Sequence, residues 1–252
     1  MSPCRNGSGA AAMTTVLILG SGPNATMAQG WPRAPFDHIL TINNAWQVRP
    51  DWDALIHPHD FPPARRPVTA PGQAIVTQDD FVPAQNAYGG FVYAGGTMAF
   101  TASYWALHAN KPRVIAVMGC DMHYPAGART HFYGTGTADP LRADITLQSL
   151  EAKSARLMVL AAMQGCTMVN LSIAGPTRLV FPRVAIAALG RVSLPAFDAG
   201  LVDQALKREA ALGYIVPSGR YWEVADQFDP AALRDLDALW LRAAAAPQQM
   251  SA

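Results

Sequence analysis

Two histidines and two tyrosines lie close together in residues 119–143, a segment that could carry acid and base chemistry. They are His123, Tyr124, His131 and Tyr133. A histidine changes its charge near neutral pH, and a tyrosine hydroxyl can donate a hydrogen bond to a phosphate oxygen. The segment also holds Arg129 and Arg142, which can neutralise a negative charge. Because the segment is too long for a plain connection, we predict a lid or active-site loop; the simpler interpretation is that each side chain is only solvated.

A glycine-rich turn after the first predicted strand is suited to hold a phosphate. The apolar run Val16 to Leu19 is followed by Gly20, Ser21, Gly22 and Asn24. A buried strand followed by Gly-x-Gly-x-x-Ala is similar to the dinucleotide fingerprint, in which backbone amides and a helix N-terminus bind a phosphate. Pro23 removes one such amide. A dinucleotide site would have a carboxylate about 20 residues after the glycine turn. This chain has Asn43 and Asn44 there, so we predict a nucleotide site built from amides.

Two further stretches supply groups for the same kind of site. In the stretch AGGT, Gly95 and Gly96 let the backbone approach a ligand, and Thr97 begins a predicted helix whose N-terminus favours an anion. A tight packing turn would explain these glycines equally well. Asp121 follows the fifth predicted strand, so its carboxylate should reach the edge of the sheet where ligands of parallel α/β folds bind.

The stretch HPHD at residues 57–60 has the residue types of a metal site, but its spacing names no third or fourth ligand. We therefore expect no metal. Cys120 and Cys166 occupy apolar strand positions, where packing is the usual role, and the chain has no Gly-x-Ser-x-Gly motif. The sequence thus gives no sign of a covalent nucleophile.

The composition argues against several classes of protein. The chain has 252 residues and a net charge of +1, so charge gives no reason to expect a nucleic-acid partner. It has no uninterrupted apolar run of about 18 residues, the length that suggests a membrane span. Its three cysteines are too few and too irregularly spaced for a disulfide framework. We expect a cytoplasmic protein without a membrane span.

Short β-branched runs alternate with helical patterns along the chain, which predicts the α/β class: a Rossmann-like, mostly parallel sheet flanked by helices. We expect strands at 16–19, 39–42, 54–56, 74–76, 114–117 and 168–171, and helices at 97–109 and 145–163. Residues 60–96 are rich in Pro, Gly and Gln, which indicates long loops with one or two short strands.

Three parts follow from this pattern. Residues 1–13 should be a disordered tail, residues 14–175 a nucleotide-binding domain that includes the lid at 119–143, and residues 176–252 a C-terminal helical extension. The extension carries two amphipathic helical patterns. These helices could form a cap or the face of a homo-oligomer.

The order of the motifs resembles the bacterial sialyltransferases of glycosyltransferase family 42, and more loosely the archaeal 6-hydroxymethylpterin diphosphokinase-like family. The similar stretches are the GSGP turn, the strand ending NNAW, the helix GGTMAFTASYWAL and the strand VIAVMGCDMHY. They span roughly Val16 to Ser172. The resemblance to the sialyltransferases implies a Rossmann-like domain with a lid that binds a CMP-sugar without metal and transfers the sugar with inversion.

The resemblance also implies roles for single residues. Gly20, Gly22 and Asn24 would lie against the nucleotide phosphate, Asn43 would contact the nucleotide or the donor sugar, Gly95 and Gly96 would approach the nucleotide, and Asp121 would organise the strand end or the ribose. The family's base histidine precedes the long helix, where this chain has Asp139 and Pro140. His131, or failing it His123, is therefore the expected base, and Tyr124 and Tyr133 the expected donors to the departing phosphate.

These observations predict a glycosyltransferase that moves a sugar from a nucleotide-activated donor, a CMP-sugar by preference, to a hydroxyl of a glycan acceptor. Two alternatives stay open. A diphosphokinase-like enzyme would need carboxylates for Mg²⁺, for which Asp121 and Asp60 are the best placed. A non-catalytic assembly protein with a vestigial nucleotide site would expose apolar stripes around Trp222 and Trp240.

Overall fold

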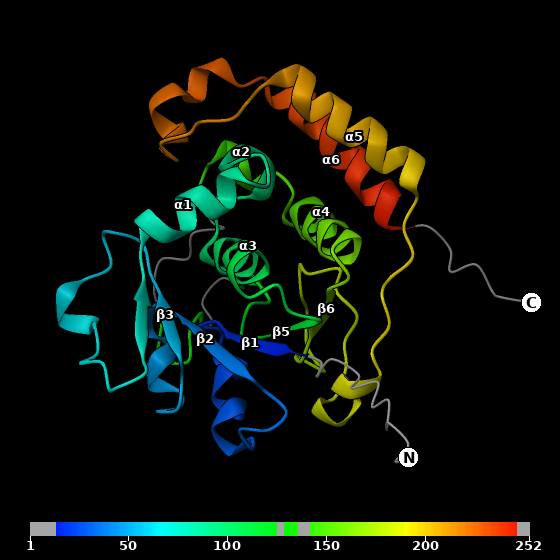
Figure 1. The fold of residues 1–252 in the computed structure, drawn as a ribbon. Helices are drawn as coiled ribbons and strands as arrows, with labels where there is room; N and C mark the ends of the chain where they lie inside the picture. Colours follow the sequence, from blue (N-terminus) through cyan, green and yellow to red (C-terminus); the bar gives the residue numbers. More distant parts are fainter. Residues whose placement is uncertain (1–13, 125–128, 136–141, 246–252) are drawn as a thin grey trace, which may run out of the picture.

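A computed structural model describes residues 14–124, 129–135 and 142–245. Its centre is a six-stranded sheet in the order β4-β3-β2-β1-β5-β6, in which all neighbours pair in parallel (Figure 1). The strands are β1 Thr15–Leu19, β2 His38–Ile42, β3 Ala54–Ile56, β4 Ala74–Val76, β5 Val114–Met118 and β6 Thr167–Asn170. The predicted α/β, Rossmann-like fold is therefore confirmed.

Both faces of the sheet are buried, as parallel sheets require. Along β1, Val16 and Ile18 belong to one apolar core, whereas Leu17 and Leu19 belong to a second core on the opposite face. All four side chains are fully buried. The run of apolar residues that predicted this strand therefore serves two cores at once.

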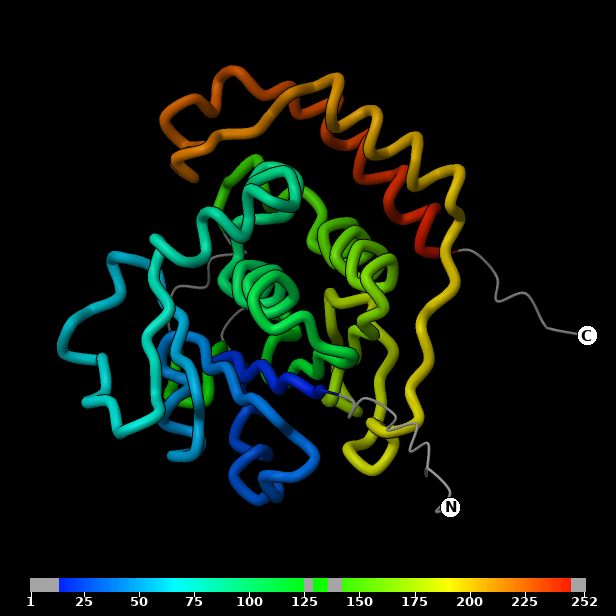
Figure 2. Tube along the Cα trace, viewed as in Figure 1, coloured from blue at the N-terminus to red at the C-terminus, as the bar shows by residue number. Residues whose placement is uncertain are grey.

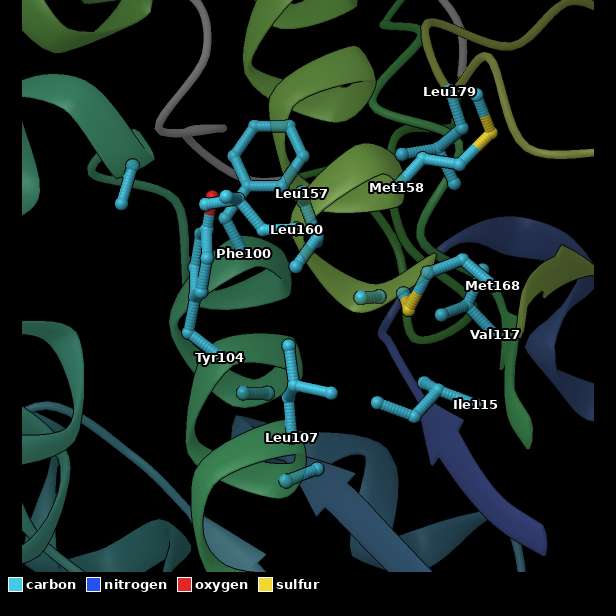
Figure 3. Packing of buried hydrophobic residues seen from close by; sticks show 14 of the residues in the cluster. Phe100, Tyr104, Leu107, Ile115, Val117, Leu157, Met158, Leu160, Met168 and Leu179 are labelled. Atoms are coloured by element: carbon cyan, nitrogen blue, oxygen red, sulfur yellow. The ribbon is translucent and has the colours of Figure 1, made fainter. Parts of the chain in front are cut away.

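Helices cover one face of the sheet. They are α1 Gln78–Asn86, α2 Phe91–Ala94, α3 Met98–Asn110 and α4 Leu150–Met163. Figure 1 shows these helices on the same side of the strands. Phe100 and Tyr104 of α3 and Leu157 of α4 belong to the apolar core on this side of the sheet (Figure 3). The Tyr104 hydroxyl accepts a hydrogen bond from Nη1 of Arg156 on α4 at 2.8 Å.

Short 3₁₀ helices and loops cover the opposite face. Buried residues of this second core come from η1 Pro23–Gly30, η2 Asn43–Gln47 and η6 Ile186–Arg191. Two further 3₁₀ helices are η3 Pro63–Arg65 and η5 Ile145–Leu147. The connections that follow β1 and β2 thus contain 3₁₀ helices in place of α-helices.

The C-terminal part adds an outer helical layer. It consists of α5 Ala199–Leu212, η7 Tyr221–Gln227 and α6 Pro230–Ala244, and Figure 1 shows α5 and α6 beyond α4 on the side away from the sheet. Both predicted C-terminal helices are present. Before them, residues 177–184 return to the sheet, where the amide of Asn170 donates to the carbonyl of Pro182.

The structure differs from the expected elements in two places. The predicted helix 145–163 is divided into η5 and α4, because Ser149 caps α4 by accepting a hydrogen bond from the amide of Ala152 at 3.1 Å. Residues 60–96 contain α1 and α2 in addition to the short strand β4. The amide of Thr77 donates to the Asp80 carboxylate at 2.8 Å, which stabilises the start of α1.

Within the ranges that the structure describes, no helix is both long and apolar enough to cross a bilayer. The predicted tail, residues 1–13, and parts of the predicted lid, residues 125–128 and 136–141, lie outside these ranges, as do residues 246–252.

Candidate functional site

A cleft of about 1160 Å³ lies at the carboxyl edge of the sheet. Seven parts of the chain line it: the segments after β2 and β3, helix α1, Phe91 of α2, the start of α3, the segment before η5, and residues 218–223. Ligands of open parallel sheets bind beyond the carboxyl ends of the strands, and small-molecule sites measure roughly 300–1,000 Å³. The cleft therefore has the place of a substrate site and is somewhat larger than most small-molecule sites.

Asn43 lines the cleft directly after β2 with an unusual backbone conformation. Its φ angle is +52°, in the left-handed region that asparagine tolerates better than other non-glycine residues. Its Oδ1 atom is buried and has no hydrogen-bond partner in the described part of the chain. Such strained residues cluster at ligand sites, so Asn43 is a candidate ligand contact. Asn44, the other predicted asparagine, is buried outside the cleft lining, and its Oδ1 likewise lacks a partner among the described residues.

The start of α3 forms another part of the wall. Gly96 and Met98 line the cleft, and the hydroxyl of Thr97 caps the helix by accepting from the amide of Phe100 at 3.3 Å. Gly95 has a φ angle of +91°, and a Cβ on it would lie 2.8 Å from the Phe100 ring, so the turn itself requires this glycine. The amide of Gly96 donates to the hydroxyl of Thr146 at 3.1 Å. The partly positive N-terminus of α3 thus faces the cleft. Gly95 is explained by the tight packing of the turn.

Arg142 and Asp144 enter the cleft wall as part of a hydrogen-bonded cluster with Tyr221. Nε of Arg142 donates to Oδ2 of Asp144 at 2.9 Å, and Nη2 donates to the hydroxyl of Tyr221 at 3.1 Å. The Tyr221 hydroxyl in turn donates to Oδ2 of Asp144 at 2.8 Å. On the other side, Oδ1 of Asp144 accepts from the amide and the hydroxyl of Thr146 at 2.8 and 2.6 Å. The cluster joins residues 142–146 to Tyr221, a residue distant in sequence.

The cluster has a defined protonation state at neutral pH. Burial would raise the pKa of Asp144, but hydrogen bonds from Thr146, Tyr221 and Arg142 together outweigh it and hold the pKa below its usual value. Burial, followed by the hydrogen bond to Asp144, raises the pKa of Tyr221. Asp144 is therefore a carboxylate and Tyr221 a neutral hydroxyl donor.

The glycine turn at Gly20 to Asn24 packs against the end of β5 and does not line the cleft. The amide of Gly20 donates to the carbonyl of Met118, and that of Gly22 donates to the carbonyl of Gly119, each at 2.8 Å. A Cβ on Gly20 would lie only 2.4 Å from the Gly119 oxygen. We expected these amides to face a phosphate; instead both are used to hold β1 and β5 together beyond their last paired residues.

Asn24 and Asp121 form a second polar cluster at the ends of β1, β5 and β6, outside the cleft lining. Oδ2 of Asp121 accepts from Nδ2 of Asn24 at 2.9 Å and from the hydroxyl of Ser172 at 2.6 Å. Oδ1 of Asp121 accepts from Nδ2 of Asn170 at 2.9 Å. Of the two roles that the sequence left open for Asp121, this geometry fits the organisation of the strand ends.

The described part of the predicted lid rests on the glycine turn. The amide of Phe132 donates to the carbonyl of Ser21 at 3.0 Å, and His131 and Gly134 exchange backbone hydrogen bonds in a tight turn. The ring of His131 stacks on that of Tyr133 at 5.0 Å, and its Nδ1 lies 2.8 Å from the Thr130 hydroxyl. None of the four predicted catalytic residues, His123, Tyr124, His131 and Tyr133, lines the cleft.

His59 is the histidine that the fold does place in the cleft. All six histidines of the chain lie in the described ranges, and of these only His59 lines the cleft; it is exposed, next to Asp60. His57 is buried behind it, with Nδ1 2.8 Å from the carbonyl of Pro58. Across the described chain, no three His, Cys, Asp or Glu side chains lie close enough together to hold a metal ion.

Several lining residues have no counterpart in the sequence prediction. They are Asp79 of α1, Asp144, Arg220, Tyr221, Trp222 and Glu223. The stretch RYWE, with two aromatic side chains between charged ones, was the available signal for the last four. The last four residues lie at the cleft because their segment packs on α1. The side-chain amide of Asn86 on α1 donates to the carbonyl of Pro217 at 2.7 Å. Figure 2 shows the orange C-terminal segment beside α1 and α2.

The chain was compared with models of known protein families, with curated proteins and with solved structures, and none of the three comparisons found a match.

Proposed function

We propose that the protein transfers a sugar from a nucleotide-activated donor, a CMP-sugar by preference, to a hydroxyl of an acceptor, with inversion and without metal. The observation that carries the proposal is the cleft itself. It lies at the carboxyl edge of a parallel sheet and brings Asn43 and Gly96, two residues of the sialyltransferase resemblance, together with the guanidinium of Arg142. An unpartnered amide oxygen, a helix N-terminus and a cation suit a sugar phosphate.

The donor would be bound through its phosphate and its sugar. The N-terminus of α3 and the Arg142 side chain offer positive charge at the same wall of the cleft. Asn43 lines the cleft, and its carboxamide can form a hydrogen bond with a hydroxyl or amine of the donor. Tyr221 and Asp144 hold Arg142 in place through the hydrogen bonds described above.

His59 would take the proton of the acceptor. The acceptor oxygen forms a bond to the anomeric carbon while the bond from that carbon to the phosphate oxygen breaks, and its electron pair leaves with CMP. The hydroxyl proton passes to His59, which later releases it to water. Negative charge develops on the departing phosphate, where Arg142 and the start of α3 stabilise it. We therefore move the role of base from His131 to His59, because a base must reach the reacting hydroxyl.

Turnover of CMP-sugar donors by matched histidine variants tests this assignment. General base catalysis contributes about 10² to 10⁴ in rate, so His59→Ala should lower kcat by that factor. His131→Ala and His123→Ala should stay within about threefold, and CMP affinity should be unchanged in all three variants. A loss of turnover in His131→Ala with full activity in His59→Ala would instead return the base to the lid.

The diphosphokinase-like alternative keeps one supporting observation. Asp60 and Asp79 both line the cleft, and carboxylate oxygens are the ligands that Mg²⁺ prefers. Asp121, its other expected ligand, is hydrogen-bonded elsewhere to Asn24, Asn170 and Ser172. Binding of a nucleoside diphosphate that depends on Mg²⁺ would favour this alternative.

The assembly-protein alternative required exposed apolar stripes around two tryptophans. Trp222 is 58% exposed, whereas Trp240 is 1% exposed and donates from Nε1 to Glu209 at 2.8 Å inside the protein. The helix that was expected to offer an apolar surface thus buries its tryptophan against the rest of the fold. We keep the enzymatic proposal for this reason.

A further inference from the structure

Three aromatic rings form a continuous strip along one wall of the cleft. They are Phe81 of α1, Phe91 of α2 and Tyr221 of η7, and all three line the cleft. The Phe91 ring stacks on that of Tyr221 at a centroid distance of 6.1 Å and meets that of Phe81 edge-on at 6.4 Å. A Cβ on Gly219 would lie 3.1 Å from the Phe91 ring, so the chain before Tyr221 packs directly on it. Elements distant in sequence thus build one aromatic surface, which we call the aromatic strip.

Apolar side chains of this wall remain partly open to the cleft. Val82 of α1 and Met98 of α3 line the cleft beside the rings, and both are only partly buried, as is Phe91. All three pack against the apolar core on this side of the sheet. Apolar groups inside a concave site favour a ligand that has an apolar part of its own. The phosphate and the sugar of the donor are polar and do not explain this wall.

The aromatic strip runs from the proposed phosphate position toward the proposed base. At one end, a Cβ on Gly96 would lie 2.8 Å from the Tyr221 hydroxyl, so this hydroxyl is beside the start of α3. At the other end, Phe81 belongs to α1, which begins two residues after β4. His59 follows β3, and β3 and β4 are paired along their whole length. A ligand on the strip therefore extends from the departing phosphate toward His59.

The imidazole of His59 lacks a partner that would strengthen it as a base. Within the described ranges, the hydrogen bonds of His59 are confined to its carbonyl, which accepts from Nη2 of Arg66 at 3.2 Å. Where a histidine serves as base, a carboxylate bonded to its ring commonly stabilises the imidazolium that forms. A base without this support removes a proton most readily from an acidic hydroxyl. A phenolic hydroxyl has a pKa of about 10, well below that of an alkyl hydroxyl.

We propose that the acceptor is a phenol, whose ring lies on the aromatic strip and whose hydroxyl reaches His59. The inference rests on the proposed function, since it names the acceptor of that reaction. The phenolic oxygen forms a bond to the anomeric carbon, the bond from that carbon to the phosphate oxygen breaks, and its electron pair leaves with CMP. The proton passes from the phenol to His59 and then to water, so the product is an aryl glycoside. Phe91 offers the stacked or edge-on contact that aromatic rings prefer.

Saturation-transfer NMR on the full chain tests the binding of the ring. The probe is β-naphthol, and decahydro-β-naphthol, which has the same carbon skeleton without aromatic rings, is its matched control. β-Naphthol should bind with a Kd about three- to tenfold lower than that of the saturated alcohol, the value of an aromatic contact. Equal binding of the two probes, or tighter binding of the saturated one, would overturn the inference.

Two variants locate this binding on the strip. Phe91→Leu keeps an apolar side chain but removes the ring, so it should raise the Kd of β-naphthol about three- to tenfold. Met98→Gln places a polar group of similar length on the same wall and should also raise this Kd. Met163→Gln, the same change at an exposed methionine of α4 outside the cleft lining, should leave it unchanged. Unchanged β-naphthol binding in both cleft variants would overturn the inference. Met98→Gln decides if Phe91→Leu does not fold, because the Met98 side chain is partly exposed.

Transfer from a CMP-sugar tests the argument from the hydroxyl. β-Naphthylmethanol carries the same rings as β-naphthol but an alkyl hydroxyl. At saturating acceptor, β-naphthol should react about tenfold faster or more, since proton removal by a positioned base follows the acidity of the hydroxyl. Equal rates, or a faster reaction of the alkyl alcohol, would overturn the proposed acceptor class.

A CMP titration of the same samples separates the two proposals. CMP binding without β-naphthol binding would reject the phenolic acceptor and leave the proposed function standing. β-Naphthol binding that both cleft variants weaken, without CMP binding, would reject the proposed function and leave a site for an aromatic ligand. A loss of CMP affinity in Phe91→Leu as large as the loss of β-naphthol affinity would overturn the inference, because the strip would then hold the nucleobase of the donor.

Discussion

Replacement of Glu209 by alanine should loosen the C-terminal helices by leaving a charge unpaired inside the protein. Glu209 lies on α5 and accepts two hydrogen bonds from Arg156 of α4, from Nε and Nη2, each at 2.8 Å. It also accepts from Nε1 of Trp240 on α6 at 2.8 Å. The Arg156 side chain is 2% exposed and lies over the rings of Tyr104 and Trp240 at 5.8 and 5.5 Å. One carboxylate thus joins three helices.

The size of the effect follows from burial. Removal of one partner of a buried ion pair typically costs about 3–5 kcal/mol, because the other charge stays in a medium of low polarity. For a chain of this length, each kcal/mol lowers the melting temperature by roughly 2–4 °C, so the expected fall is about 6–20 °C. The matched control is Lys207→Ala on the same helix. Lys207 pairs with Asp203 at 2.7 Å, but the pair is exposed, so its loss should cost at most about 1 kcal/mol.

Differential scanning calorimetry of single and double variants measures this effect. Arg156→Met should destabilise the protein in the same way, since it leaves the Glu209 carboxylate buried without its cation. In the double variant neither charge remains, so its loss of stability should be clearly smaller than the sum of the two single losses. Strictly additive losses, or a fall for Glu209→Ala no larger than that for Lys207→Ala, would refute the reasoning.

Three further predictions concern the cleft and the glycine turn. Asn43→Gly keeps the positive φ angle but removes the carboxamide, so calorimetry should show CMP affinity lowered about two- to tenfold, the value of one hydrogen bond, without a large change in melting temperature; unchanged affinity would remove Asn43 from the site. Gly20→Ala should cost about 1–3 kcal/mol in denaturant unfolding, because its Cβ would collide with the Gly119 oxygen; a neutral result would contradict the close packing described here. The pKa of Asp144 is lower in the folded than in the unfolded state, so its contribution to stability is present above about pH 4 and is lost as the pH falls through the folded pKa. The unaltered protein should therefore lose more stability than Asp144→Asn between pH 5 and pH 3, and parallel pH profiles would contradict the assigned hydrogen bonds.

The strands were predictable because apolar runs report burial on both faces of a parallel sheet. All six predicted strands are present, with ends that differ by at most one residue. Helix α1 was missed because it contains Pro83 and has a polar sequence, QDDFVPAQN, whose helical form depends on the cap at Thr77 and on packing against α3. Helix α2 has four residues, too few to show a periodic pattern.

The site residues that could be predicted are those whose position follows from their own local sequence. Asn43 follows β2 and Gly96 precedes α3, so each could be placed at the edge of the sheet from its local sequence. Tyr221 and Trp222 reach the cleft because the C-terminal segment folds back over α1, a contact between residues more than 130 apart in sequence. Asp79 lies at the start of α1, a helix that the sequence did not predict. No local pattern reports such a contact.

The glycine turn has a sequence pattern that two different structural roles share. A Gly-x-Gly pattern after a strand satisfies the demands of a phosphate site, but it equally allows two backbones to approach closely. In this fold the amides of Gly20 and Gly22 are donated to the end of β5. The sequence alone cannot distinguish these two uses, because both need a residue without Cβ at the same positions.

A calorimetric titration of the full chain with CMP, with and without Mg²⁺, tests the central claim most directly. The account predicts that CMP binds equally well under both conditions, and that Arg142→Met weakens this binding because the cation at the start of α3 is lost. No heat of binding with CMP, or binding that appears only with Mg²⁺, would contradict the proposal that this cleft holds the donor of a metal-independent glycosyl transfer.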